Sequence, residues 1–548
     1  MTEQYSSFVP FADAAGVHYV LLVTAITVAF FLYQTIKPIK LDDDLPCPES
    51  HFLFGFVPYL ARHRQQWPTE TTRLANLYKR TWAGPCPRLP GNILPPVIFF
   101  ISQEANMKYV LQDNFENYVK GKVLENVLGD LVGKGIFAVD GSKWKTHRKL
   151  MSNMFSRNLL RNSAAVMRQK LQDVLQDMEN TINTLEKGTG GADTATLDNH
   201  CRKNAEIDMK DLLLRISFDV TSKIAFGVDL NTISKSNSTN DDQHPFFTAF
   251  DEMSCVIYNR MSDPLYPMKR RLGIGSEKHT AKLKCTIDDF AMGLIAERRM
   301  NVEKGIHIPA SANAGGEGNN FDLLTKYIEY AQKEKEEVSD RDLRDIVVTV
   351  MFAGRDTLSS TLSWAFYELD RNPHVKQTLI HEVKSICGTG EDAEYSFETM
   401  NELKYTHCVL LETLRLYPPV PENIRYAVKS DTLPDGTRIP PGAGIGLSYC
   451  AMGRNTEIWG QDAAEFRPER FLGEKEPSSF KYPVFHAGPR VCIGKSLAMM
   501  NMKLVLSMLL SSGIEFKDKC KHSGEYQMAL VVSMKGSFPI EISRRKSV

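Results

Sequence analysis

The chain has 548 residues, of which 43% are hydrophobic and 24% charged, as in a large globular protein with one layered domain and appended segments. Its 66 basic residues balance its 66 acidic ones, so it lacks the basic excess of a nucleic-acid-binding protein, and we expect no nucleic-acid partner. The ten cysteines form no CxxC pair, which argues against a zinc site or a disulfide framework and indicates reduced thiols on the cytosolic side.

An apolar run near the N-terminus, residues 14–33, is long enough at about 20 residues to span a bilayer. No basic segment precedes it and no Ala-x-Ala site follows, so a retained anchor is favoured over a signal peptide or a buried helix. Lys37 and Lys40 follow the run, which places the remaining chain in the cytosol. The prolines of 45–48 then predict a stiff hinge. We expect a lumenal segment 1–13, an anchor helix 14–36, a hinge 37–50 and a folded domain 51–548.

The next segments predict a strand, a short helix and three loops. Residues 97–101 are continuously apolar and predict a buried strand. Trp144 and Arg148 are four residues apart and therefore share a helix face, where such a pair by itself indicates a surface cation–π contact. Three polar, Gly-, Ser- or Asn-rich segments predict disordered loops, at 187–197, 233–244 and 308–320.

A long helix is predicted over roughly 340–370, because Ser339 and the acid three residues on form a capping box and a proline follows the end. Gly354 lies in its middle and costs about 1 kcal/mol there, so it requires a reason. One reason is room for a diatomic ligand, beside an acid–alcohol pair, Asp356 and Thr357, that can pass protons. The alternative is a helix kink with a capped hydroxyl.

The following region predicts another helix, a hairpin and a strand. Thr399 and Glu402 predict the capped start of a helix that runs to Tyr417. Glu412 and Arg415 lie on one face of it among leucines, which predicts a buried ion pair. Pro-Asp-Gly-Thr at 434–437 predicts a hairpin turn, and the apolar residues 528–532 predict a strand.

One loop before an apolar helix carries the strongest signal: Phe485-His486-Ala487-Gly488-Pro489-Arg490-Val491-Cys492-Ile493-Gly494. Its glycines allow a tight turn and a close approach to something bulky. Amides at the start of the helix favour the thiolate of Cys492, which is then a suitable axial ligand for haem iron. Arg490 is placed to meet a haem propionate. A buried structural cysteine is the alternative, and the absence of CxxCH excludes covalent haem attachment.

These ten residues resemble the haem-binding signature of the cytochrome P450 superfamily, and other segments resemble its remaining motifs in the same order. Ala353–Thr357 is similar to A-G-x-D-T-T, with Leu358 in place of the second threonine. Residues 412–415 are similar to E-x-x-R, and 466–471 to the element whose arginine, Arg470, completes that ion network. Residues 144–148 are similar to the family's W-x-x-x-R helix.

The resemblance implies a mainly α fold with a small β region, in which haem b lies between the long central helix and the cysteine loop. Cys492 would be the axial ligand of the haem iron, while Gly354, Asp356 and Thr357 would serve oxygen binding and proton delivery. The implied structural residues are Glu412, Arg415 and Arg470. The implied cofactor-binding residues are Trp144, Arg148, Arg425, Phe485, Gly488, Arg490, Cys492 and Gly494.

The resemblance also implies a haem-thiolate monooxygenase, anchored by one span in the endoplasmic reticulum membrane, with its catalytic domain in the cytosol. It would take electrons from NADPH–cytochrome P450 reductase and insert one atom of O2 into a C–H bond of a lipophilic substrate. Residues 353–357, 414–425 and 485–490 are most similar to the fatty-acid and alkane ω-hydroxylase branch. We therefore expect a narrow channel for acyl chains, with walls formed by Val347, Val350, Met351 and residues 419–424.

Other functions stay open on the sequence alone. A sterol, terpene or xenobiotic hydroxylase of the same superfamily is the first alternative. A non-catalytic haem-binding sensor is the alternative from another class of protein. A non-oxygenating relative, an isomerase or dehydratase, is disfavoured because the Asp356–Thr357 pair is intact.

Overall fold

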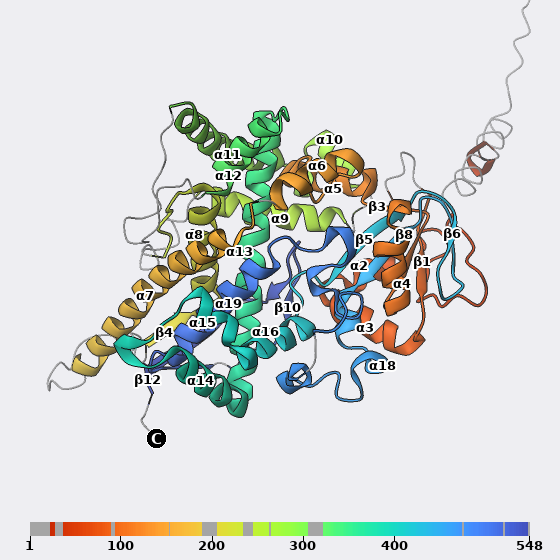
Figure 1. Cartoon of the computed structure of the whole chain (residues 1–548). Helices are drawn as coiled ribbons and strands as arrows, with labels where there is room; N and C mark the ends of the chain where they lie inside the picture. The colour runs from red at the N-terminus through yellow and green to blue at the C-terminus, as the bar shows by residue number, and fades with distance from the viewer. Residues whose placement is uncertain are drawn as a thin grey trace, which may run out of the picture.

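The structure is a computed structural model, and it describes residues 22, 24–27, 37–88, 94–152, 154–188, 205–233, 245–261, 263, 265–304, 322–473, 476–518 and 521–545. Helices dominate the fold, as predicted (Figure 1). The α-helices labelled here are α2 (Val57–His63), α3 (Trp67–Tyr78), α4 (Glu104–Lys108), α5 (Gly121–Val132), α6 (Gly141–Ser152), α7 (Arg157–Gly188), α8 (Met209–Phe226), α9 (Pro245–Arg260), α10 (Tyr266–Leu272), α11 (Thr280–Glu303), α12 (Leu323–Lys333), α13 (Asp340–Arg371), α14 (Pro373–Cys387), α15 (Phe397–Glu402), α16 (Lys404–Leu416), α17 (Tyr449–Gly453), α18 (Thr456–Trp459) and α19 (Lys495–Ser511).

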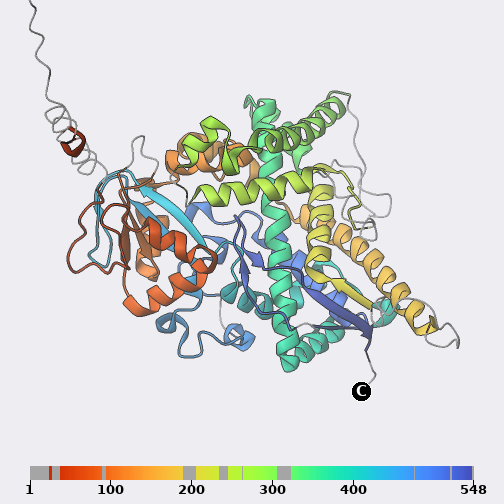
Figure 2. The same cartoon turned by 180° about the vertical axis from the view of Figure 1, so that it is seen from behind.

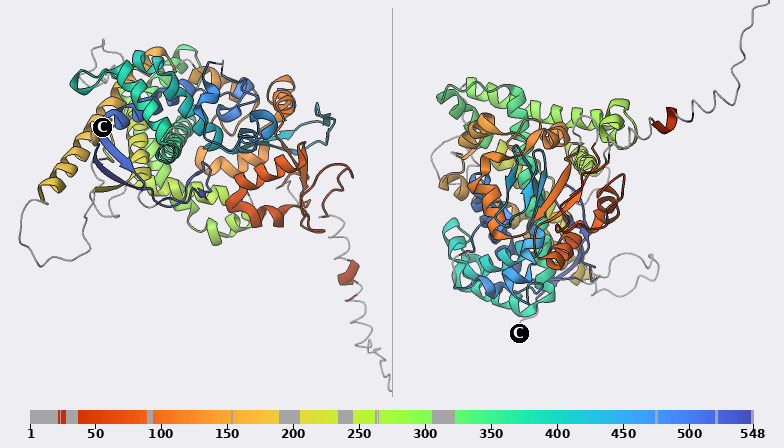
Figure 3. Two further views of the ribbon diagram at one scale, coloured as in Figure 1. Left: turned by 90° about the horizontal axis from the view of Figure 1, so that it is seen from below. Right: turned by 90° about the vertical axis from the view of Figure 1, so that its right-hand side faces the viewer.

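Within the described parts of the chain the strands form one larger sheet and three small ones, which confirms the small β region. The five-stranded sheet has the order β1 (Trp82–Pro85), β2 (Val97–Ile101), β8 (Gly444–Ser448), β5 (Glu422–Ala427) and β3 (Tyr118–Val119). β2 and β8 are parallel, with Ile98 opposite Gly444. The left view of Figure 3 shows this sheet at one end of the molecule, away from α7. The small sheets are β4 (Ala205–Asp208), β12 (Pro539–Arg544) and β9 (Ile514–Lys517); β10 (Tyr526–Gln527) with β11 (Ser533–Met534); and β6 (Asp431–Thr432) with β7 (Arg438–Ile439).

The long predicted helix is α13, and it runs through the middle of the molecule (Figures 1 and 2). Ser339 and Asp342 form the predicted capping box, and Pro373 starts α14 directly after the helix ends. Leu343, Val347 and Met351 are completely buried in the main core, which also includes residues of α8, α16 and α19. The hydrophobic periodicity therefore placed the core-facing side of α13 correctly.

Two predicted elements differ from the structure. Thr399 lies inside a separate short helix, α15, which Ser396 caps, and Leu403 is extended before α16 begins. Residues 528–532 form the turn between β10 and β11 rather than a strand. Their backbone is used elsewhere: Val532 N donates to Pro419 O at 2.8 Å, and Ser360 Oγ donates to Val532 O at 2.7 Å.

Most of the predicted anchor helix, 14–36, lies outside the described residues, which include Leu22 and 24–27 of it. Among the parts of the chain that the structure describes, no helix has both the length and the apolar character needed to cross a membrane. Of the three predicted loops, the described residues include 187–188 and 233, and the remaining loop residues lie outside them.

Candidate active site

The cysteine loop is held in a tight turn against the sheet side of the molecule. Cys492 N donates to Phe485 O at 2.8 Å, which closes the loop between the two residues. Gly488 has a φ of +65°, and a Cβ there would lie 2.1 Å from Leu111 O, so the close approach excludes any side chain. Gly494 has an ordinary φ of −83° and is the N-cap of α19. The sequence prediction of a close backbone approach is thus confirmed at Gly488.

The side chain of Cys492 is exposed, and the protein atoms around it still raise the pKa of the thiol by burial. The backbone amides of Gly494 and Lys495 act in the opposite direction and lower the pKa of Cys492, as does the charge of Arg148. The start of α19 therefore points its amides at the sulfur, as the sequence predicted.

Part of the middle of α13 is exposed, although the helix crosses the core. Ala353 is exposed there, and the Thr357 hydroxyl donates to Ala353 O at 2.7 Å. Burial raises the pKa of Asp356 to about 6. The acid and the alcohol predicted for proton delivery thus lie on a stretch of α13 that is not packed on all sides.

Gly354 has a packing reason that the sequence did not reveal. A Cβ at this position would lie 2.7 Å from Thr221 Oγ1 and 2.8 Å from Thr221 Cγ2 on α8. The missing side chain lets α13 and α8 approach each other closely, because a methyl group would have to displace Thr221. The close contact between the two helices is therefore a sufficient reason for glycine at this position, independent of the expected room for a diatomic ligand.

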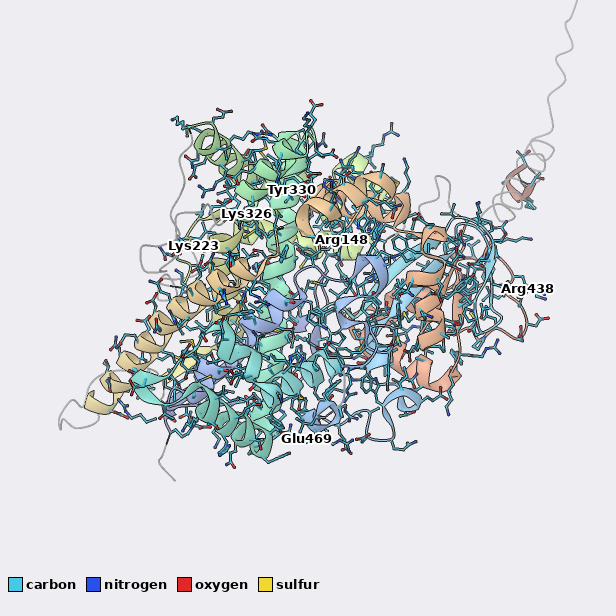
Figure 4. All side chains as sticks on the ribbon, in the orientation of Figure 1. Arg148, Lys223, Lys326, Tyr330, Arg438 and Glu469 are labelled. Carbon is cyan, nitrogen blue, oxygen red and sulfur yellow. The ribbon has the colours of Figure 1, made fainter. Side chains whose placement is uncertain are left out.

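Arg490 lies in a cage of ring and carbonyl groups beside the cysteine. Its guanidinium donates to Asp140 Oδ1 at 2.7 Å and to Val139 O at 2.8 Å, and its Cζ lies 4.5 Å from the centroid of the Trp144 ring. Trp144 and Arg490 lie 346 positions apart in the sequence and therefore meet only in the folded structure. Arg148 Nη1 donates to Val491 O at 2.6 Å, next to the cysteine. Figure 4 shows Arg148 in the middle of the molecule.

Arg425 joins this group from β5. It donates to Asn423 Oδ1 at 3.0 Å, and its Nη2 lies 2.5 Å from His486 Nε2. Lys120 Nζ donates to the same Asn423 oxygen at 2.7 Å. Because an arginine has no acceptor, His486 Nε2 accepts this hydrogen bond through its lone pair, as in a neutral imidazole.

The electrostatics of this basic cluster favour an anionic ligand. Burial and the neighbouring Arg425 lower the pKa of Arg490 to about 10, and the same causes lower the pKa of Lys120 well below its usual value. Burial also lowers the pKa of Arg425 and of His486. Arg425 Nε is buried without a hydrogen-bond partner among the described residues. The two carboxylates of haem b would supply the missing negative charge and acceptors, so the residues present fit that cofactor.

The predicted ion network behind the loop is confirmed. Glu412 and Arg415 are completely buried and make two contacts, at 2.7 and 2.8 Å. Arg470 Nε donates to Glu412 Oε1 at 2.9 Å, and Arg467 N donates to the same oxygen at 2.8 Å. Removing one partner of such a pair typically costs about 3–5 kcal/mol, because the other charge stays buried and unpaired.

Sequence reasoning did not identify three residues in and around the basic cluster, and it assigned two core residues to the wall of the substrate channel. Lys120 lies in a segment without a motif, whereas Asn423, in the segment 414–425, and His486, in the cysteine loop, were not assigned to cofactor binding. The prediction that Val347 and Met351 line a substrate channel is wrong, because both are completely buried in the core. Val350 is partly buried, as are Val420 and Ile424 of the opposite predicted wall.

Comparison with known proteins gives one family. The family model described as Cytochrome P450 matches residues 45–525. Cytochrome P450 CYP94D109 of Paris polyphylla is 34% identical to this chain, over 81% of the chain and 85% of the relative. Cytochrome P450 704C1 of Pinus taeda is 35% identical over 75% and 78%, respectively. Cytochrome P450 94B3 of Arabidopsis thaliana is 30% identical over 97% and 98%.

Proposed function

The chain belongs to the cytochrome P450 family, and from that premise we propose that it is a membrane-attached fatty-acid ω-hydroxylase. It is a monooxygenase that binds haem b through a cysteine thiolate and takes O2, a lipophilic substrate and electrons from a redox partner. The balanced reaction is R–H + O2 + NADPH + H⁺ → R–OH + H2O + NADP⁺. The proposed electron donor is NADPH–cytochrome P450 reductase.

The proposed division of roles follows the contacts. Cys492 would be the axial ligand of the iron, and the bound haem would supply the activation of O2. Arg425 and Arg490 would bind its carboxylates, with Trp144 stacked on Arg490 and Arg148 holding the backbone next to Cys492. Phe485, Gly488 and Gly494 would shape the loop. Asp356, whose pKa burial raises to about 6, would take up and release a proton close to neutral pH, and Thr357 would pass it into the active site.

The substrate proposal is carried by one observation, the similarity of residues 353–357, 414–425 and 485–490 to the ω-hydroxylase branch. The exposed Ala353 on α13 and the partly buried Val420 and Ile424 would provide apolar surface for the substrate. Terminal methyl C–H bonds are stronger than internal ones, so the enzyme must admit the chain end and keep internal carbons away. A narrow apolar channel would do this.

Membrane attachment is proposed on two grounds. The apolar run 14–33 is the proposed anchor, followed by the hinge 37–50 and the catalytic domain 51–548, which would face the cytosol at the endoplasmic reticulum. The domain also exposes large apolar side chains, several of them on or beside a basic helix, α10, which carries Lys269, Arg270 and Arg271. We call this set the apolar surface: Phe52, Phe54, Met261, Leu265, Met268, Leu272 and Ile274.

The product of the reconstituted enzyme tests the proposed function. With reductase, NADPH and saturated fatty acids of twelve to eighteen carbons, we expect mainly ω-hydroxy acids, identified by mass spectrometry. Sterols and terpenes in the same assay serve as comparison substrates. Mainly mid-chain products, or turnover of sterols without turnover of fatty acids, would contradict the proposal.

A further inference from the structure

Arg355, between Gly354 and Asp356, is a completely buried arginine in the middle of α13 with a side-chain exposure of 1%. Its guanidinium makes two contacts with Asp251 on α9, Nη1 to Oδ1 at 2.5 Å and Nη2 to Oδ2 at 3.0 Å. The same Nη1 lies 3.3 Å from Asp356 Oδ1. One positive charge is thus shared by two carboxylates from different helices.

The two carboxylates differ in their access to water. The Asp251 side chain is 51% exposed, whereas that of Asp356 is 20% exposed. Asp251 is therefore accessible to water, while the charge of Asp356 depends on its protein neighbours. A change at the surface of α9 can reach Asp356 through a single side chain.

Three aromatic rings keep the guanidinium in place independently of Asp251. The Arg355 Cζ lies 3.8 Å from the centroid of the Phe247 ring, 5.6 Å from that of Phe250 and 5.9 Å from that of Phe218. Such cation–π contacts stabilise a desolvated guanidinium. When Asp251 loses its charge, Arg355 is expected to stay beside Asp356 rather than swing out into solvent.

We propose that Arg355 is a positioning residue that shares its charge between Asp251 and Asp356, so that Asp251 on α9 controls the proton held at Asp356. This inference rests on the proposed role of Asp356 in proton delivery. It adds a part of the site outside the cysteine loop and the Asp356–Thr357 pair. A movement of α9 that lengthens the Asp251 contact would bring the full positive charge to Asp356.

The charges around the three residues agree in direction. Burial raises the pKa of Asp356, Arg355 lowers it and Asp251 raises it. Burial opposes the charge of Arg355, but Asp356, Asp251 and the more distant Asp211 of α8 together raise its pKa. Asp211 is itself bound by Arg215 at 2.6 Å, and Lys210 of the same helix interacts with Asp251.

The test uses opposite charge changes in the full-length, haem-loaded enzyme. The protonation midpoint of Asp356 is measured by infrared difference spectroscopy over pH, using the carboxyl band that Asp356→Asn removes. Arg355→Gln should raise the midpoint by roughly one unit or more, because the stabilising positive charge is lost. Asp251→Asn should lower it, because Arg355 then serves Asp356 alone. A purely structural role for either residue would not give shifts of opposite sign.

A matched control is available at the start of the same helix. Arg299 Nε contacts Asp340 Oδ1 at 2.6 Å, and the Asp340 side chain is 49% exposed, close to the 51% of Asp251. Asp340→Asn should leave the midpoint unchanged. If Arg355→Gln does not fold, Asp251→Asn still tests the proposal, because it changes a solvent-exposed residue. An unchanged or raised midpoint of Asp356 in that variant overturns the proposal.

A second measurement separates this inference from the proposed function. Product formed per NADPH consumed is recorded for each variant, with hydrogen peroxide as the uncoupled product (NADPH + H⁺ + O2 → NADP⁺ + H2O2). Unchanged coupling in Asp356→Asn would overturn the proton-delivery role of Asp356, while opposite midpoint shifts would still support the sharing of Arg355. Reduced coupling in Asp356→Asn without those shifts would overturn the inference and leave the proposed function standing.

Discussion

At the scale of single residues, the environment of Cys492 distinguishes it from the other described cysteines. Cys450 is completely buried, and Arg454 Nη1 lies 3.2 Å from its sulfur, whereas Cys492 is exposed and has two amides and Arg148 beside it. We therefore expect Cys492→Ala to lose the thiolate-type absorption spectrum of the reduced carbon monoxide complex. It should keep part of its haem, because Arg425 and Arg490 remain to bind the carboxylates.

Cys450→Ala is the control for this prediction and should keep the thiolate-type spectrum. Absorption spectra of both variants, with haem content measured separately, make the comparison. A thiolate-type spectrum in Cys492→Ala would show that another residue is the axial ligand.

At the scale of secondary-structure elements, the contact between α13 and α8 depends on Gly354. Alanine normally favours a helix over glycine by about 1 kcal/mol. At Gly354, however, its Cβ would lie 2.7 Å from Thr221 Oγ1, and overpacking of this kind typically costs about 1–3 kcal/mol. Gly354→Ala should therefore lower the melting temperature, and adding Thr221→Ala should recover part of the loss.

Gly293, inside α11, provides the matched control. A Cβ there would meet nothing within 4 Å, so Gly293→Ala should leave the melting temperature unchanged or raise it. Thermal unfolding followed by circular dichroism measures all three variants. A higher melting temperature in Gly354→Ala alone would contradict the prediction and show that Thr221 moves aside at little energetic cost.

At the scale of the whole molecule, we expect two contacts with the membrane rather than one. Within the apolar surface, Phe52 is 71% exposed and Leu272 is 61% exposed. Arg64 donates to Asn259 Oδ1 and accepts from Tyr258 at its carbonyl, which holds the chain after Phe54 against the end of α9, just before Met261. Deleting residues 1–40 should release the protein only partly from carbonate-washed membranes, because the apolar surface still enters the bilayer.

Serine substitutions at Phe52, Phe54, Leu265, Met268 and Leu272 in the shortened chain should release the rest. The same substitution at Met292, Met300 and Leu472, which are also exposed, should not. Fractionation followed by immunoblotting measures the release. Complete release by the deletion alone would contradict the second contact, and unchanged retention would contradict the anchor at 14–33.

A tertiary contact explains why one local prediction failed. Thr399 and Glu402 carried a helix-start pattern, but the start of α16 lies beyond them and is capped from another helix. Glu382 of α14 accepts from Tyr405 N at 2.6 Å and from Thr406 N at 2.8 Å. A capping group that lies more than 20 residues away along the chain leaves no local pattern, so the break at Leu403 was invisible in the sequence.

The sequence by itself determined the features whose partners lie within one turn or one loop. These include the capping box and end of α13, the Glu412–Arg415 pair and the cysteine loop, because each is specified by residues a few positions apart. Only the tertiary structure decided that Lys120, Arg425 and His486 form one basic cluster, that Gly354 faces α8, and that Asp251 shares Arg355 with Asp356. These contacts join distant segments, and packing rather than local pattern sets which side chains meet.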